Sequence, residues 1–414
     1  MSGMKSVARR DLKYLLLDMI STTRLVDTKK TVGLGASDWQ TLCKMAAQHR
    51  LGPILHHHRK MHAQEWAVPE DVANIWAESY RQSALRSLRV RHSLHRLDAI
   101  LNAALIPYAA LKGAWLFLHA YTQPALRPMR DIDIIVAPEN ALKVLDILER
   151  NGFKRRDEYA KPPEHALEYT KHLPPLRCQK SGISVEVHTR LMEHITVTEK
   201  SGTIGDTSAL LERIERHGGI AFLPPTDTLL HLIVHAVYDH HFDNGPLTLN
   251  DIASLVRSSE IDWERFWEMA KIGNWARGCS LLFAMVRRYH DQVVLPYPAG
   301  TTPPPSTHHL DCALLLTLQD FDQRAIVSFR AELAVAPSLL RRTALLWRRA
   351  FPARHVLAAF AGSPSASWWI LVHYPKWLIA RAGQMLFERQ SDDVKIDIRR
   401  AAHVASWLQA KENA

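Results

Sequence analysis

The sequence predicts an α+β fold in which a small mixed sheet lies between helical N-terminal and C-terminal parts. Apolar residues recur at helical spacing up to about residue 100 and again from about residue 224, whereas short apolar runs alternate with helices between them. The chain has 414 residues, more than one typical domain. We therefore expect a helical N-terminal region 1–100, an α/β core 101–223, a helical region 224–295 that completes a cleft, and a helical C-terminal domain 306–414.

The N-terminal region is expected to contain three main helices. The first spans 11–26, and the second begins at Ser37, a plausible N-cap. The third is long and basic and runs from Pro69 towards Ile100, with the proline in its first turn.

The core is expected to mix short strands with helices. Its strands are predicted at 106–111, 131–136, 153–157, 168–172 and 183–188, and its helices at 114–121 and 138–151. Gly152 fits the C-terminal end of the second helix. Further helices are predicted at 229–238, 249–256, 263–272 and 279–290, before a proline-rich linker at 296–305 and a mostly helical remainder.

Composition narrows the classes of partner and compartment. The formal net charge of +10 favours anionic partners, that is nucleotides, nucleic acid or acidic membrane, without choosing among them. The four cysteines are far apart and form no CxxC pair, so we expect neither a structural zinc site nor a disulfide framework. The N-terminus leads into charged Arg9, Arg10 and Asp11 and not into an apolar signal core, which predicts a cytoplasmic protein.

The best candidate for a transmembrane helix does not meet the requirement for one. Residues 368–387 are apolar but contain His373, Pro375, Lys376 and Arg381, whereas a spanning helix needs about 20 residues with almost no charge. No transmembrane segment is therefore expected. The tryptophans of this stretch fit core packing, a stacking surface for bases or a membrane interface.

Two aspartates lie one residue apart in the apolar run Asp-Ile-Asp-Ile-Ile-Val. On a strand, Asp131 and Asp133 point to the same face while Ile132 and Ile134 point to the other. Two adjacent carboxylates repel each other unless a cation lies between them. A pair of divalent metal ions that performs phosphate chemistry is the usual solution.

With the turn Lys112-Gly113 before this pair and the strand Val185-Glu186-Val187-His188 after it, the chain resembles nucleotidyltransferases of the DNA polymerase beta type. It is most similar to their uncharacterised subfamily, in which Lys-Gly replaces Gly-Ser. The resemblance extends over about residues 30 to 290, through His231, His235 and Asn250-Asp251. It implies a small polymerase-beta-like mixed sheet.

The resemblance also implies a set of roles. Asp131, Asp133 and Glu186 would be catalytic and would bind Mg²⁺ or Mn²⁺. Lys112 and Gly113 would form the turn that contacts the nucleotide, with ATP as the default triphosphate. Arg127 and Arg130, just before the acidic pair, and His188, on the strand face of Glu186, are placed by their sequence positions to contact the nucleotide as well. The physical properties of these residues agree, since a glycine lets backbone approach phosphate oxygens and arginine binds phosphate through two hydrogen bonds. The expected reaction transfers a nucleoside monophosphate, most simply AMP, to an acceptor hydroxyl or phosphate and releases pyrophosphate.

The sequence departs from the pattern of the superfamily at Ala114, where a serine hydroxyl is missing. The interval from Gly113 to Asp131 is also longer than in compact members. These departures leave open a non-catalytic nucleotide-binding or scaffold protein on the same fold. A basic nucleic-acid-binding protein is a further alternative. The acceptor stays open among small molecules, sugars, peptides, proteins and RNA, and nucleic acid is not the favoured partner. We expect no zinc site at His231 and His235, or in the run 56–58.

Overall fold

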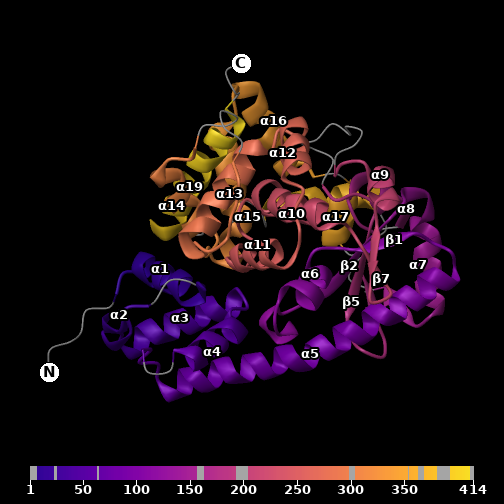
Figure 1. The fold of residues 1–414 in the computed structure, drawn as a ribbon. Helices are drawn as coiled ribbons and strands as arrows, with labels where there is room; N and C mark the ends of the chain where they lie inside the picture. The colour runs from indigo at the N-terminus through magenta and orange to yellow at the C-terminus, as the bar shows by residue number, and fades with distance from the viewer. Residues whose placement is uncertain are drawn as a thin grey trace.

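The computed structural model describes residues 7–22, 26–62, 65–155, 163–192, 204–297, 304–352, 354–361, 368–379 and 392–410. It confirms the α+β prediction, since a seven-stranded mixed sheet lies among many helices. Figure 1 shows the sheet on one side of the molecule, with the N-terminal helices beside it and the C-terminal helices above. Within the described residues, no helix is both long and apolar enough to span a bilayer.

The N-terminal part is a set of helices that ends in one very long helix. They are α1 (Arg9–Ile20), α2 (Thr28–Val32), α3 (Ala36–Gln48), α4 (Gly52–Met61) and α5 (Glu70–Ala103). The prediction of Ser37 as an N-cap was wrong, because α3 begins after Gly35. The N–H of Gly35 donates to the Asp38 carboxylate at 3.1 Å, which leaves Ser37 inside the first turn.

Helix α5 connects the N-terminal helices to the sheet. It has 34 residues and runs along one side of the molecule from α4 to the strands (Figure 1). The Ser83 hydroxyl donates to the carbonyl of Ala125 at 2.7 Å, and the Arg86 guanidinium donates to the carbonyls of Met129 and Arg130. The helix therefore holds the segment that leads into the acidic strand.

The sheet has the strand order β3-β4-β5-β2-β1-β7-β6. Its strands are β1 (Tyr108–Ala110), β2 (Asp131–Val136), β3 (Phe153–Arg155), β4 (Leu176–Cys178), β5 (Ser184–His188), β6 (Glu215–His217) and β7 (Ile220–Phe222). Strand β2 is central, antiparallel to β1 and parallel to β5. Four of its residues, Ile132, Ile134, Ile135 and Val136, are completely buried, as are Val185 and Val187 of β5.

The helices of the core pack around this sheet, and one predicted strand is wrong. They are α6 (Gly113–Trp115), a π-helical turn (Leu116–Ala120), α7 (Ala141–Arg150), α8 (Pro163–Tyr169) and α9 (Thr207–Glu212). The prediction of a strand at 168–172 was wrong: α8 buries Ala166 and packs against α7, and only His172 makes an isolated bridge, with His188. Residues 156 and 157 of the predicted strand 153–157 lie outside the described residues.

Helices return after β7, as expected. They are α10 (Pro225–Val234), a π-helical turn (His235–Asp239), α11 (Leu247–Ser258), α12 (Trp263–Ile272), α13 (Ala276–Tyr289), α14 (Thr307–Leu316), α15 (Arg324–Val335), α16 (Leu339–Ala350), α17 (Arg354–Ala361) and α19 (Asp392–Gln409). Most of the predicted linker 296–305 lies outside the described residues. Helix α1 joins the C-terminal helices through ion pairs from Arg9 to Asp320 at 2.7 Å and from Lys13 to Asp397 at 3.6 Å.

Candidate functional site

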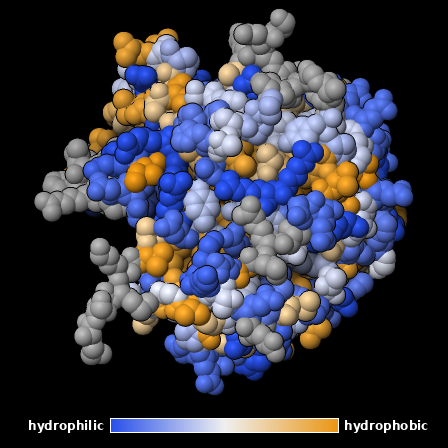
Figure 2. Space-filling view, turned by 60° about the vertical axis from the view of Figure 1, so that its left-hand side comes forward, coloured by the Kyte–Doolittle hydropathy of each residue, from blue (hydrophilic) through white to orange (hydrophobic). Residues whose placement is uncertain are grey.

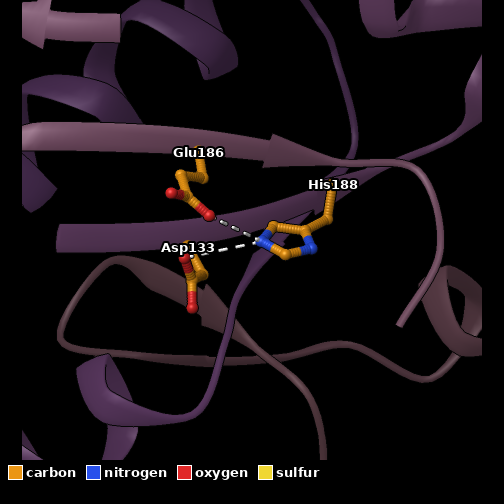
Figure 3. A group of neighbouring side chains, drawn as sticks. All are labelled: Asp133, Glu186 and His188. Carbon is orange, nitrogen blue, oxygen red and sulfur yellow. Dashed lines mark ion pairs between the residues drawn. The ribbon is translucent and has the colours of Figure 1, made fainter. Parts of the chain in front are cut away.

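The parallel pairing of β2 with β5 brings the acidic residues together. Asp131 lies opposite Ser184, Asp133 opposite Glu186 and Ile135 opposite His188. Because side chains alternate along a strand, Asp133 and Glu186 share one face of the sheet. Figure 3 shows both carboxylates and the ring of His188 pointing toward one another from the two strands.

His188 lies between the two carboxylates. Its Nε2 is 3.5 Å from Oδ1 of Asp133 and 3.7 Å from Oε2 of Glu186. One ligand atom from each of these three residues lies within 4.8 Å of the others, and no other such group of three ligating side chains occurs among the described residues. This is a compact set of two oxygen donors and one nitrogen donor.

The pKa values of Asp131, Asp133 and His188 depart from their usual ranges. Burial raises the pKa of Asp131 to about 6, with further contributions from the carboxylates of Asp133 and Glu186. Burial also opposes ionisation of Asp133, yet His188 and Lys112 outweigh it and hold the pKa of Asp133 below its usual range. Burial lowers the pKa of His188, but the two carboxylates reverse that effect and raise it on balance.

The Lys112-Gly113 turn leads from β1 into the same site. Lys112 has a φ of +38°, a strained conformation for a residue with a side chain. Its Nζ lies 4.0 Å from Oδ2 of Asp133 and donates to Nδ1 of His235 at 3.3 Å. Burial lowers the pKa of Lys112. At Gly113 a Cβ would lie 2.6 Å from Sδ of Met129, so the glycine permits this close approach to the segment before β2.

Arg127 and Arg130 differ in their surroundings. The Nε of Arg127 donates to both carboxylate oxygens of Asp251 on α11, at 2.8 and 3.0 Å, and the hydroxyl of Tyr121 donates to the same carboxylate at 2.7 Å. The Arg130 guanidinium instead lies over the ring of Phe321, 5.8 Å from its centroid. Arg127 is thus fixed by a buried acid, whereas Arg130 is held by a weaker aromatic contact.

All eight predicted site residues line one cleft of about 520 Å³. They are Lys112, Gly113, Arg127, Arg130, Asp131, Asp133, Glu186 and His188. Other parts of the chain also line the cleft, and sequence reasoning assigned none of these residues a role at the site. They include Arg50, Lys171, His172, Asp239, His240, Asp243, Asp251, Phe321 and Arg324.

No sequence motif marks Arg50 or Phe321 as a residue of the site. Arg50 follows α3 with a φ of +57°, and burial lowers its pKa to about 10, with contributions from Arg127 and Arg130. For Asp251 a signal existed, since Asn250-Asp251 belongs to the stretch that carries the family resemblance. His235 lines the cleft from its place beside α10, with its ring 6.0 Å from that of His231.

Ala114, the position of the missing serine, is completely buried and does not line the cleft. Neither His231 with His235 nor the run 56–58 belongs to a group of three ligands among the described residues. In the run, Nδ1 of His58 makes a hydrogen bond of 2.9 Å with the carbonyl of Met19.

The chain belongs to the uncharacterised nucleotidyltransferase family, whose model matches residues 35–291 and thus more than half of the sequence. This confirms the family resemblance inferred from the motifs. No curated protein and no solved structure matches the sequence.

Proposed function

We propose that this protein is a metal-dependent nucleotidyltransferase that moves a nucleoside monophosphate, AMP from ATP in the simplest case, to an acceptor hydroxyl or phosphate. The observation that carries the proposal is the convergence of Asp133, Glu186 and His188 beside Asp131 in a cleft that Lys112 and Gly113 also line. Family membership supports nucleotidyl transfer in general. The proposal does not specify the acceptor, which can be a small molecule, a sugar, a peptide or a protein.

The donor atoms of the site fit Mg²⁺ or Mn²⁺, because both ions favour carboxylate oxygen. Asp131, Asp133 and Glu186 would hold the ions. The raised pKa of Asp131, about 6, supports this assignment, since burial and two neighbouring carboxylates create negative charge that a cation would stabilise. A bound divalent ion would neutralise the negative charge of the phosphates and would lower the pKa of an acceptor hydroxyl.

The remaining residues have roles that their positions support. Lys112, Arg127 and Arg130 offer positive charge to the phosphates, and Asp251 fixes the direction of the Arg127 guanidinium. In the transfer, the acceptor oxygen bonds to the α-phosphorus while the bond to the bridging oxygen breaks, and pyrophosphate leaves. Glu186 accepts the proton of a hydroxyl acceptor, and His188 orients that carboxylate.

The test is replacement of Asp131 and Asp133 by Asn, which keeps shape but removes charge. We expect pyrophosphate release with ATP, Mg²⁺ and a panel of acceptors to fall about a thousandfold or more, with the fold retained. Binding of Mn²⁺, followed by electron paramagnetic resonance, should weaken by on the order of tenfold or more in the Asp133→Asn variant. The exposed Asp291→Asn variant is the matched control. Unchanged Mn²⁺ binding and transfer in both site variants would refute the assignment.

A non-catalytic nucleotide-binding protein on the same fold is the second candidate, and Ala114 in place of serine favours it. Calorimetry with ATP and Mg²⁺ separates the two functions. Nucleotide binding that depends on Asp133, without pyrophosphate release for any acceptor in the panel, would favour the non-catalytic candidate. A nucleic-acid-binding protein would instead show affinity that falls steeply with salt.

A further inference from the structure

Helix α16 exposes its apolar residues and has a strongly basic sequence. The exposed fractions are 77% for Leu339, 81% for Leu340 and 64% for Trp347, and Leu346 is also exposed. At 100° per residue, these four side chains lie on one half of the helix, which we call the apolar face of α16. Arg341 and Arg348 lie together on one flank of this face, and Arg342 lies on the other. Most surface helices show the opposite arrangement, with polar residues outward.

The surrounding sequence has only one sign of charge. From Leu333 to Phe387 there is no Asp or Glu, whereas the stretch contains these basic residues: Arg341, Arg342, Arg348, Arg349, Arg354, Lys376 and Arg381. In a chain with 42 acidic residues, an acid-free segment of this length is a distinct cationic region. It is complementary to an anionic partner.

Helix α16 belongs to a small unit with its own apolar cluster. Leu357 and Trp377 form this cluster, separate from the main core. The indole of Trp377 donates to the carbonyl of Arg349 at 3.3 Å, and the hydroxyl of Tyr374 donates to the carbonyl of Pro352 at 2.9 Å. The same unit exposes further apolar side chains, namely Leu371, Val372 and Ile379. Figure 2 shows hydrophobic side chains exposed among strongly hydrophilic ones on one side of the molecule.

Three partners could cover such a face, and charge and shape favour one of them. A second copy would bring two acid-free basic surfaces together, which is electrostatically unfavourable. Nucleic acid would use the arginines but leave the aliphatic Leu339 and Leu340 in water, because bases stack on aromatic rings. An anionic membrane surface accommodates both the apolar residues and the arginines. Leucine and tryptophan enter the headgroup boundary, and arginine binds lipid phosphate.

We propose that α16 is an interfacial helix that docks the protein on membrane surfaces containing anionic lipid. The helix lies in the plane of the interface with its apolar face in the acyl boundary and Arg341 and Arg348 at the headgroups. The proposal is independent of the chemistry of the cleft.

The test is cosedimentation of the full chain with vesicles of phosphatidylcholine alone and with vesicles in which phosphatidylglycerol replaces part of it. Binding is expected only to the anionic vesicles and should weaken as salt rises. Replacing Leu339, Leu340 and Trp347 together by Ser should weaken binding by about tenfold or more. Replacing Arg341 and Arg348 by Gln should weaken it by about 30-fold. All five side chains are exposed, so the variants should fold.

Matched controls lie on other surfaces of the same chain. Ile75, Leu88 and Leu105 are exposed apolar residues, and their joint replacement by Ser should leave vesicle binding unchanged. Lys143→Gln with Lys154→Gln is the corresponding charge control. The Asp133→Asn variant should bind vesicles normally, which separates this proposal from the enzymatic one. Equal binding to both vesicle types, no binding, or a concentration-dependent dimer that the apolar replacement abolishes would overturn it.

Discussion

At the scale of single residues, Asp251 is the acid on which the position of Arg127 depends. Its buried carboxylate accepts hydrogen bonds from Arg127 and Tyr121. Removing the acid leaves a largely buried guanidinium without its charge partner, which typically costs about 3 kcal/mol or more, whereas removing one neutral hydroxyl donor costs about 1 kcal/mol. The two partners should therefore differ clearly in their effect on stability.

We predict that Asp251→Ala lowers the free energy of unfolding by about 3 kcal/mol or more and Tyr121→Phe by about 1 kcal/mol. Urea denaturation measures both. Asp291→Ala, at an exposed position, is the control and should change little. Equal losses for Asp251→Ala and Tyr121→Phe would show that the ion pair does not dominate this network.

At the scale of elements, α5 acts as a support for the segment between Arg127 and Arg130. The Arg86 guanidinium donates to two successive carbonyls of that segment, directly before Asp131. Those bonds fix the entry into β2. Arg86 is therefore a positioning residue, and its effect should appear in the order of the segment.

We predict that Arg86→Ala speeds hydrogen–deuterium exchange of residues 127–130 about tenfold, because the loss of two hydrogen bonds lowers the cost of local opening. Exchange in α12 and α13 should stay the same. Arg91→Ala, at an exposed position on the same helix, provides the control. Uniformly faster exchange throughout the chain would indicate global destabilisation and contradict a local role.

At the scale of the whole molecule, histidines whose pKa is lowered by burial make the fold sensitive to acid. Burial lowers the pKa of His49 to about 4, of His58 to about 4 and of His290 to about 3. An unfolded histidine titrates near 6.5, so the unfolded state binds more protons below that pH. Their stabilising contribution is present above pH 6.5 and is lost as pH falls from about 6.5 towards 4. The raised pKa of Asp131 acts in the opposite direction between about pH 6 and 3.8.

We predict that each of these histidines lowers the free energy of unfolding by about 1–2 kcal/mol when the pH falls from 7 to 5. His49→Leu should flatten the dependence of unfolding free energy on pH by about one proton over this interval. Exposed His92→Gln should leave the slope unchanged. Denaturation at a series of pH values measures this, and an unaltered slope in the His49 variant would contradict the assignment.

Local patterns predicted the longer elements well and the short ones poorly. Strand 131–136 and helix 263–272 match β2 and α12 residue for residue, because alternation and helical spacing are local properties. Strands β4, β6 and β7, each of three residues, were not predicted, whereas the equally short β1 and β3 lie inside the predicted strands 106–111 and 153–157. The predicted strand at 168–172 was wrong because its first two residues end α8, a helix that packs against α7.

The sequence by itself determined that Asp131 and Asp133 share one face, that a Lys-Gly turn precedes them and that the chain belongs to a nucleotidyltransferase family. These properties follow from side-chain alternation and from motif order. Only the tertiary structure decided that Glu186 lies opposite Asp133 and that Arg50 and Phe321 line the same cleft. Strand pairing and helix packing join residues far apart in the chain, and no local pattern carries that information.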